Sequence, residues 1–184
     1  MRIVAGALGG RRLVAPKGRG VRPTLEKVRE AVFSILGARV VEARVLDLFA
    51  GSGAMGIEAL SRGALSAVWC DVDERSIAAI QENVEKLGLT KQGNILHMTA
   101  QSAIRYMSRK GRQFDIIFMD PPYEQGLYEI TLMELAGSSL IKGNSIVCVE
   151  HPKRAELPTV FGSLIQDRRR QYGDSAVTFY QRSQ

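Results

Sequence analysis

The sequence predicts an α/β fold, with a doubly wound, mostly parallel sheet of seven strands that finishes in an antiparallel hairpin. From residue 44 onward, short apolar runs alternate with amphipathic stretches, and such runs are typical of parallel strands that helices cover on both faces. This alternation indicates repeated βαβ units. The 184 residues are enough for one domain with a full core, because single domains span ~100–200 residues.

The N-terminal part is expected to form a small β-hairpin followed by a helix. Segments 3–5 and 12–14 flank a glycine-rich stretch, which favours a turn between them. Pro23 and Thr24 then start a helix, and Gly37 fits the position just past its end. The apolar stripe of this helix consists of Val28, Ala31, Val32 and Ile35.

The central part is expected to contain five buried strands with helices between them. The strands are the apolar runs at 45–49, 67–70, 95–98, 116–119 and 146–149. Helical spacing of apolar residues predicts helices around 77–87, 104–107 and 132–136. The runs at 164–169 and 176–181 are joined by Tyr172-Gly173-Asp174, a turn sequence that predicts the final antiparallel hairpin.

The net charge of +6 resides in the first 22 residues. Six of the 25 lysines and arginines lie there, and the other 19 balance the 19 acidic residues. The six are Arg2, Arg11, Arg12, Lys17, Arg19 and Arg22. A basic block beside a neutral domain favours an anionic partner, with nucleic acid as the first candidate and a solvated arm as the alternative. We therefore divide the chain into a basic extension, residues 1–37, and a second part, residues 38–184.

Composition excludes several classes of protein. No apolar run approaches the ~20 residues that a transmembrane helix needs, and the N-terminus lacks a secretory signal, so we expect a cytoplasmic protein without membrane contact. Cys70 and Cys148 lie in apolar runs and are expected to be buried thiols. With only His97 and His151 besides, no zinc-ligand spacing exists, and we expect no metal.

Residues 45–56 predict a strand that leads through a glycine-rich turn into a helix, an arrangement that binds nucleotides. Gly51, Gly53 and Gly56 fit G-x-G-x-x-G, and Asp71 follows Gly51 by 20 residues, the spacing of an acid that binds a ribose. An NAD-dependent oxidoreductase is therefore an alternative, although the chain has little room for a second nucleotide-binding half. Asp47 favours a nucleoside with a cationic amino group, and S-adenosylmethionine (SAM) carries one.

The sequence Asp120-Pro121-Pro122-Tyr123 follows the fourth predicted strand, at the edge where open α/β sheets bind ligands. The exocyclic amine of a nucleobase is a poor nucleophile because its lone pair is delocalised into the ring. The Asp120 carboxylate and the Pro121 carbonyl can accept hydrogen bonds from that amine and stabilise its growing positive charge during methyl transfer. Tyr123 offers a ring that can stack on an extruded base. A rigid turn with a surface tyrosine is the structural alternative.

Three stretches of the chain carry a resemblance to a known family. They are residues 2–33 (RIVAG, GRRL, RPT and VREAVF), 47–64 (DLFAGSGAMGIEALSRGA) and 120–123 (DPPY). In these stretches the chain resembles the bacterial small-subunit ribosomal RNA guanine-N2 methyltransferases. The resemblance implies a Rossmann-like class I methyltransferase fold, with SAM as the methyl donor and S-adenosylhomocysteine as its product. The implied substrate is one guanine in the head of 16S rRNA, modified late in subunit assembly.

The resemblance also implies roles for individual residues. The cofactor-binding residues would be Asp47, Phe49, Ala50, Gly51, Gly53, Gly56, Asp71, Val72, Ser102 and Asp120. The catalytic residues would be Asp120, Pro121, Pro122 and Tyr123, and the RNA-binding residues would be Arg11, Arg12, Arg22 and Arg29. Ser102 departs from the family, many members of which have an aspartate there near the adenine. For Arg29, a surface ion pair with Glu26 or Glu30 is the alternative to an RNA contact.

Two further functions stay open besides the oxidoreductase. A DNA adenine-N6 methyltransferase could use the same Asp120 motif, but it would usually need a separate target-recognition region. A non-catalytic RNA-binding module is the other alternative. On the preferred interpretation, residues 1–37 are an RNA-binding extension and residues 38–184 are the catalytic domain. The expected partner is 16S rRNA, either naked or within the 30S subunit or a late assembly particle, and the protein is expected to be a monomer.

Overall fold

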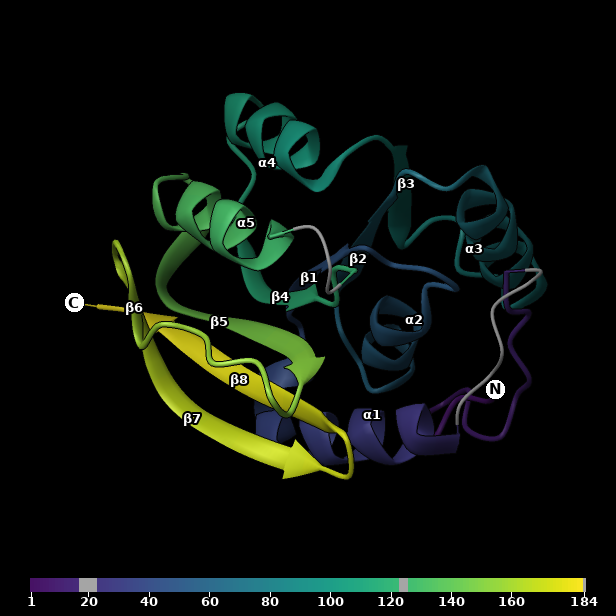
Figure 1. Cartoon of the computed structure of the whole chain (residues 1–184). Coiled ribbons are helices and arrows are strands. Elements are labelled where there is room, and N and C mark those ends of the chain that lie inside the picture. Colours follow the sequence, from purple (N-terminus) through teal and green to yellow (C-terminus); the bar gives the residue numbers. More distant parts are fainter. Residues whose placement is uncertain (17–22, 123–125, 184) are drawn as a thin grey trace.

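The computed structural model, which describes residues 1–16, 23–122 and 126–183, contains one mixed sheet with helices on both faces (Figure 1). Its described strands lie in the order β3-β2-β1-β4-β5-β8-β7-β6. They are β1 (Arg44–Leu48), β2 (Ser66–Asp71), β3 (Gly93–His97), β4 (Phe114–Met119), β5 (Ile141–Pro152), β6 (Val160–Phe161), β7 (Leu164–Tyr172) and β8 (Ser175–Arg182). Strands β1 to β5 pair in parallel, whereas β6, β7 and β8 join the sheet through antiparallel pairs.

The helices divide between the two faces of the sheet (Figure 1). One face is covered by α1 (Pro23–Leu36), α2 (Ala54–Ser61) and α3 (Glu74–Lys86), and the other by α4 (Ala100–Arg109) and α5 (Leu127–Ala136). A 3-10 helix, η1 (Gly37–Val40), leads from α1 towards β1. Because successive strand residues point to opposite faces, Val45 packs in the first core and Leu46 in the second. The predicted doubly wound α/β fold is confirmed.

The predicted count of seven strands is one too low. Strand β6 has only two residues, too few for an apolar period to show in the sequence. The predicted C-terminal hairpin is confirmed, since β7 and β8 pair in antiparallel fashion up to Tyr172 and Ser175. The turn between them contains Gly173, whose φ of 62° lies in the left-handed region that glycine adopts at little cost.

The predicted N-terminal hairpin is reduced to a single antiparallel bridge between Arg2 and Arg12. Beyond this bridge, the backbone N–H groups of Val4 and Ala5 donate to the carboxylate of Glu58 in helix α2, at 2.8 and 3.0 Å. Those donors are therefore directed to a side chain and not along a strand pair.

The N-terminal segment packs in the same core as the rest of the chain. Ile3 and Leu13 are buried in one cluster with Val32 of α1 and Val45 of β1. At its far end, Val14 exchanges two hydrogen bonds with the side chain of Asn83 in α3, at 2.8 and 2.9 Å. Within the described ranges, the structure has no helix that is long and apolar enough to cross a membrane.

Candidate active site

The main pocket lies at the carboxyl ends of β1, β4 and β5, where the N-terminal segment and α1 also reach the sheet. This is the edge at which parallel sheets bind ligands. Its lining includes Met1, Ala15, Arg29, Val32, Asp47, Phe49, Ala50, Gly51, Ser52, Met55, Asp120, Cys148, Glu150 and Val177. The structure thus brings the glycine-rich loop and the Asp120 motif, which are about 70 residues apart in the sequence, into one cavity.

The glycine-rich loop is shaped by positive φ angles and by a tryptophan beneath it. Gly51 and Gly53 have φ values of 57° and 77°, which glycine adopts readily. The indole N–H of Trp69 donates to the carbonyl of Gly53 at 3.1 Å, and a Cβ at Gly56 would lie 2.3 Å from Trp69 Nε1. Phe49 also has a positive φ, 61°, a strained conformation of the kind that is concentrated at binding sites.

Asp71 holds this loop from the end of β2. Its carboxylate accepts hydrogen bonds from the backbone N–H groups of Gly51, at 2.8 Å, and Asp73, at 2.9 Å. Next to it, residue Val72 is 59% exposed, and its carbonyl lies 3.0 Å from Nε2 of His97. The two residues therefore stand at the same edge of the sheet as the glycine-rich loop, although the main pocket does not include them.

Asp47 is a buried carboxylate directly under the loop. Among the described residues, it accepts one hydrogen bond, from the backbone N–H of Gly56 at 3.0 Å. Burial raises the pKa of Asp47 to about 8, and the nearby carboxylates of Asp71 and Asp120 add to this shift. A cation placed in the pocket would favour the ionised form of Asp47.

The Asp120 motif follows β4 and forms another part of the pocket wall. Asp120 and Pro122 are exposed, whereas Pro121 is buried. The carbonyl of Pro121 accepts a hydrogen bond from the hydroxyl of Tyr128, at 3.1 Å, and a carbonyl oxygen has a second lone pair for another donor. Tyr123, the predicted stacking residue, lies outside the described residues.

Ser102 stands apart from the main pocket, in the first turn of α4. Its backbone N–H donates to the Oγ1 of Thr99, the N-cap residue, at 3.2 Å, and its own Oγ accepts from the Thr99 hydroxyl at 2.9 Å. The side chain of Ser102 thus takes part in capping a helix at the carboxyl end of β3.

The four predicted RNA-binding arginines are in different surroundings. Arg11 and Arg12 are exposed, and Arg22 lies outside the described residues. Arg29 is buried, and its Nε lies 3.3 Å from the carboxylate of Glu58; its guanidinium also donates to the carbonyl of Arg2. Burial lowers the pKa of Arg29, an effect that Glu58 opposes. Neither surface ion pair considered for Arg29 forms, and the residue lines the main pocket from α1.

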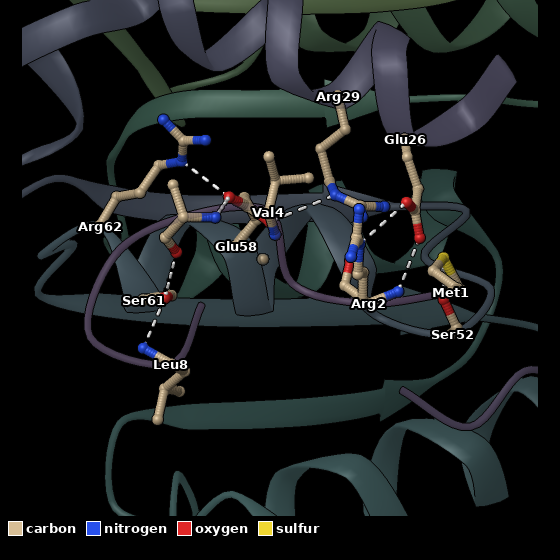
Figure 2. A network of polar contacts seen from close by, with 12 residues as sticks. Met1, Arg2, Val4, Leu8, Glu26, Arg29, Ser52, Glu58, Ser61 and Arg62 are labelled. Carbon is tan, nitrogen blue, oxygen red and sulfur yellow. Dashed lines mark hydrogen bonds and ion pairs between the residues drawn. The ribbon is translucent and has the colours of Figure 1, made fainter. Parts of the chain in front are cut away.

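Glu58 is a structurally central residue that the sequence analysis did not single out. Figure 2 shows its carboxylate between Arg29 and Arg62, with the N-terminal segment bonded to it. Arg62 lies 2.8 Å from Glu58 on the same helix. Glu58 is the one acidic residue in the α2 sequence AMGIEALS. An acidic residue in such an apolar helix could have indicated a basic partner for Glu58, because a buried charge needs compensation.

Comparison with known proteins finds relatives of this chain that are named as methyltransferases. A family described as "Conserved hypothetical protein 95" matches residues 1–181. The Escherichia coli protein "Ribosomal RNA small subunit methyltransferase D" is 36% identical over 182 residues, 99% of this chain and 90% of that protein. A solved structure described as "Putative methyltransferase yhhF from Escherichia coli" has a TM-score of 0.84 at 33% identity and covers 100% of this chain and 98% of its own.

A more distant solved structure shares the fold. It is a Thermus thermophilus 16S rRNA N2 guanine methyltransferase in complex with AdoMet and guanosine, with a TM-score of 0.72 at 22% identity, covering 92% of this chain and 45% of its own. Taken with the full-length match, this confirms the Rossmann-like methyltransferase fold. The chain therefore belongs to the family described as "Conserved hypothetical protein 95", and its expected resemblance to small-subunit ribosomal RNA methyltransferases extends over nearly its whole length.

Proposed function

We propose that the protein transfers a methyl group from SAM to the exocyclic N2 amine of a guanine in 16S ribosomal RNA. The observation that carries the proposal is the meeting of Asp47, the glycine-rich loop and Asp120 in one pocket. A methyl donor on the loop and an amine at Asp120 would therefore be neighbours. The named activity of the Escherichia coli relative supports ribosomal RNA as the substrate. The Thermus protein solved with guanosine supports guanine N2 as the acceptor.

The residues around the loop fit SAM. Bound SAM supplies a methyl group on a positively charged sulfonium, which is already activated for transfer. Asp47 offers a carboxylate that a cationic amino group would convert to its ionised form. The loop presents backbone close to the ligand without a Cβ atom at Gly51, which lines the pocket, and the exposed Val72 offers an apolar surface to an adenine ring. Asp71 holds the loop through Gly51 N–H and is proposed to bind the ribose.

The Asp120 motif is proposed to orient the acceptor amine. The Asp120 carboxylate accepts one amine hydrogen and the second lone pair of the Pro121 carbonyl accepts the other, which keeps the nitrogen lone pair free to attack the methyl group. Tyr128 fixes the position of Pro121 through its hydroxyl. Tyr123, outside the described residues, is proposed to stack on the extruded base.

The basic extension is proposed to hold the RNA. Arg11 and Arg12 are exposed on the segment that leads to the pocket through Ala15 and Pro16, so phosphates bound there would place a nucleotide close to Asp120. Arg22 and Arg29 complete the proposed set, with Arg29 acting from the pocket wall and not from the free surface. We propose that the protein works as a cytoplasmic monomer on the 30S subunit or on a late assembly particle, without a metal.

The variant Asp120→Ala tests the proposal most directly at the site. We expect a loss of methyl transfer by a factor of about 100 to 1000, because removing one group that stabilises transition-state charge has this effect. Tritiated-methyl incorporation into small-subunit RNA measures the transfer, and calorimetry with SAM and with NAD measures cofactor binding.

SAM should still bind to the Asp120→Ala protein, and NAD should not bind to either protein. Asp167→Ala, which makes the same change at an exposed carboxylate in the hairpin strand β7, serves as the matched control and should retain full activity. Unchanged incorporation by Asp120→Ala would remove Asp120 from the proposed mechanism.

A further inference from the structure

Glu150 is a carboxylate of the main pocket to which neither the sequence nor the proposed mechanism gives a role. It lies near the end of β5, which is the neighbour of β4 in the sheet. The last parallel pair between these strands joins Met119 and Val149. Asp120 directly follows Met119, and Glu150 directly follows Val149. Asp120 and Glu150 therefore stand side by side at the same edge of the sheet, and both line the pocket.

The side chain of Glu150 faces the pocket from the sheet. Because side chains alternate along a strand, Glu150 shares a face with Cys148, another lining residue. Across the antiparallel pair, Glu150 is opposite Val177, which lines the pocket as well. The carboxylate interacts with the hydroxyl of Ser175, and burial raises the pKa of Glu150. In the part of the chain that the structure describes, no lysine or arginine forms a salt bridge with it.

The charge of the pocket favours a ligand that presents hydrogen-bond donors. Asp47, Asp120 and Glu150 bring three carboxyl groups to its lining, whereas the lining arginine, Arg29, is paired with Glu58. An ionised carboxylate only accepts hydrogen bonds, and an N–H donor placed against Glu150 favours that ionised form, in opposition to the effect of burial on its pKa. The part of the wall that Asp120 and Glu150 form therefore disfavours phosphate groups and favours a base edge with several N–H groups.

The Watson–Crick edge of guanine has such a pattern of donors. Its N1–H and its N2 amine are adjacent donors, whereas the corresponding ring nitrogen of adenine is an acceptor. Enzymes that act on an extruded base identify it through hydrogen bonds to this edge. Two neighbouring carboxylates, one for N1–H and one for the amine, match guanine and repel the lone pair of an acceptor nitrogen.

We propose that Glu150 is the specificity-determining residue that accepts the N1–H of the target guanine while the neighbouring Asp120 accepts its N2 amine. This inference rests on the proposed function, because it assigns a residue to the recognition of that same base. Glu150 selects a base whose ring nitrogen carries a hydrogen next to the amine.

The test compares guanine with 2-aminopurine, which keeps the exocyclic amine but has an acceptor at N1. Reconstituted small subunits that carry either base at the mapped target position are methylated by the wild-type protein and by Glu150→Gln. The wild type should prefer guanine over 2-aminopurine by roughly 10- to 100-fold in kcat/KM, the range for a charge-assisted hydrogen bond. In Glu150→Gln this ratio should fall at least about fivefold, because an amide can donate to the N1 acceptor.

Two controls separate recognition from a loss of structure. Glu156→Gln makes the same chemical change at an exposed residue outside the pocket lining and should keep the wild-type ratio. SAM affinity of Glu150→Gln should equal that of the wild type, and a ratio of rates on two bases is insensitive to the fraction of folded enzyme. A wild-type ratio in Glu150→Gln overturns the inference and leaves the proposed function intact. Methylation by the wild type at any position other than the N2 amine of guanine overturns both the inference and the proposed function. Mass spectrometry of the product nucleoside distinguishes this outcome from the failure of the inference alone.

Discussion

Glu58 and Asp47 are two buried carboxylates with opposite surroundings. Their exposed fractions are 1% and 3%, and both lie on the same side of the sheet, near the glycine-rich loop. Glu58 is surrounded by donors, namely the guanidinium groups of Arg29 and Arg62 and two backbone N–H groups of the N-terminal segment. Within the part of the chain that the structure describes, Asp47 has one backbone donor, Gly56, and two further carboxylates nearby.

This difference indicates that the Glu58 carboxylate stabilises the fold, whereas the Asp47 carboxyl group is suited to bind a ligand. A buried charge is stable where hydrogen bonds and opposite charges compensate it, and it is costly where they do not. The compensation around Glu58 is complete within the chain, and it fastens the N-terminal segment to α2 (Figure 2). The compensation around Asp47 is incomplete, which raises its pKa to about 8, and a cationic ligand would supply the missing compensation and favour the ionised form. Two variants test this distinction, and a third tests the basic residues of the N-terminal segment that Glu58 fastens.

The largest effect is expected for Glu58→Gln. Removing the charge leaves the buried Arg29 without its partner, and we expect the free energy of unfolding to fall by about 3–5 kcal/mol. Urea denaturation followed by circular dichroism measures the change. Glu82→Gln alters an exposed pair with Lys86 on α3 and should cost less than about 1 kcal/mol.

A second measurement on Glu58→Gln follows the N-terminal segment itself. Val4 and Ala5 lose part of their acceptor, so trypsin should cleave after Arg11 or Arg12 faster than in the wild type. If Glu58→Gln is no less stable than Glu82→Gln, the carboxylate does not act as the anchor of this segment.

An intermediate effect is expected for Asp47→Asn, with a dependence on pH. The pKa of Asp47 is raised to about 8 in the folded protein, chiefly by burial. Between about pH 4 and about pH 8, the folded protein therefore keeps the proton on Asp47, whereas the unfolded chain has already lost it. Stability from this group is therefore present at low pH and is lost as the pH rises from about 4 to about 8. Without SAM, Asp47→Asn should be more stable than the wild type by about 1–3 kcal/mol at about pH 9, and the difference should shrink towards about pH 5.

Thermal unfolding of both proteins over this pH range provides the measurement. The same variant should bind SAM more weakly, because it lacks the carboxylate for the cationic amino group. A difference in stability that does not vary with pH would show that Asp47 is not protonated in the cofactor-free protein.

The smallest effect is expected for Arg11→Ala combined with Arg12→Ala. These exposed residues should leave stability unchanged and weaken RNA binding, with the slope of log affinity against log salt reduced by about 1 to 2. Filter binding to small-subunit RNA at several salt concentrations measures the slope. Arg109→Ala with Lys110→Ala, at the end of α4 on the opposite face of the sheet, is the control that should keep the wild-type slope. Equal slopes in the wild type and in both double variants would show that Arg11 and Arg12 do not contribute to RNA binding.

The fold could be predicted from the sequence because its causes are local. Apolar runs, helical spacing and the Tyr172-Gly173-Asp174 turn act over a few residues, and they anticipated the five parallel strands and the final hairpin. The glycine-rich loop and Asp120 could be placed at one edge of the sheet because parallel strands end together there.

The remaining features depend on contacts between residues far apart in the chain. Glu58 meets Val4 across 54 residues, and its pairing with Arg29 spans 29, so no local pattern shows that these charges are buried together. The same holds for Asn83, which bonds to Val14 and to the carbonyl of Ser52 in the glycine-rich loop. The side-by-side position of Asp120 and Glu150 follows from strand register, which the sequence alone does not define.

The central claim is that this pocket methylates guanine N2 in the small-subunit RNA. Its most direct test is mass-spectrometric mapping of methylated nucleosides in 16S rRNA from a strain that lacks the protein. We expect one N2-methylguanosine to be absent from that RNA, to return when the purified protein and SAM are added, and to stay absent with Asp120→Ala. An unchanged set of N2-methylguanosines in the strain, or the loss of a methylated adenine in their place, would contradict the account.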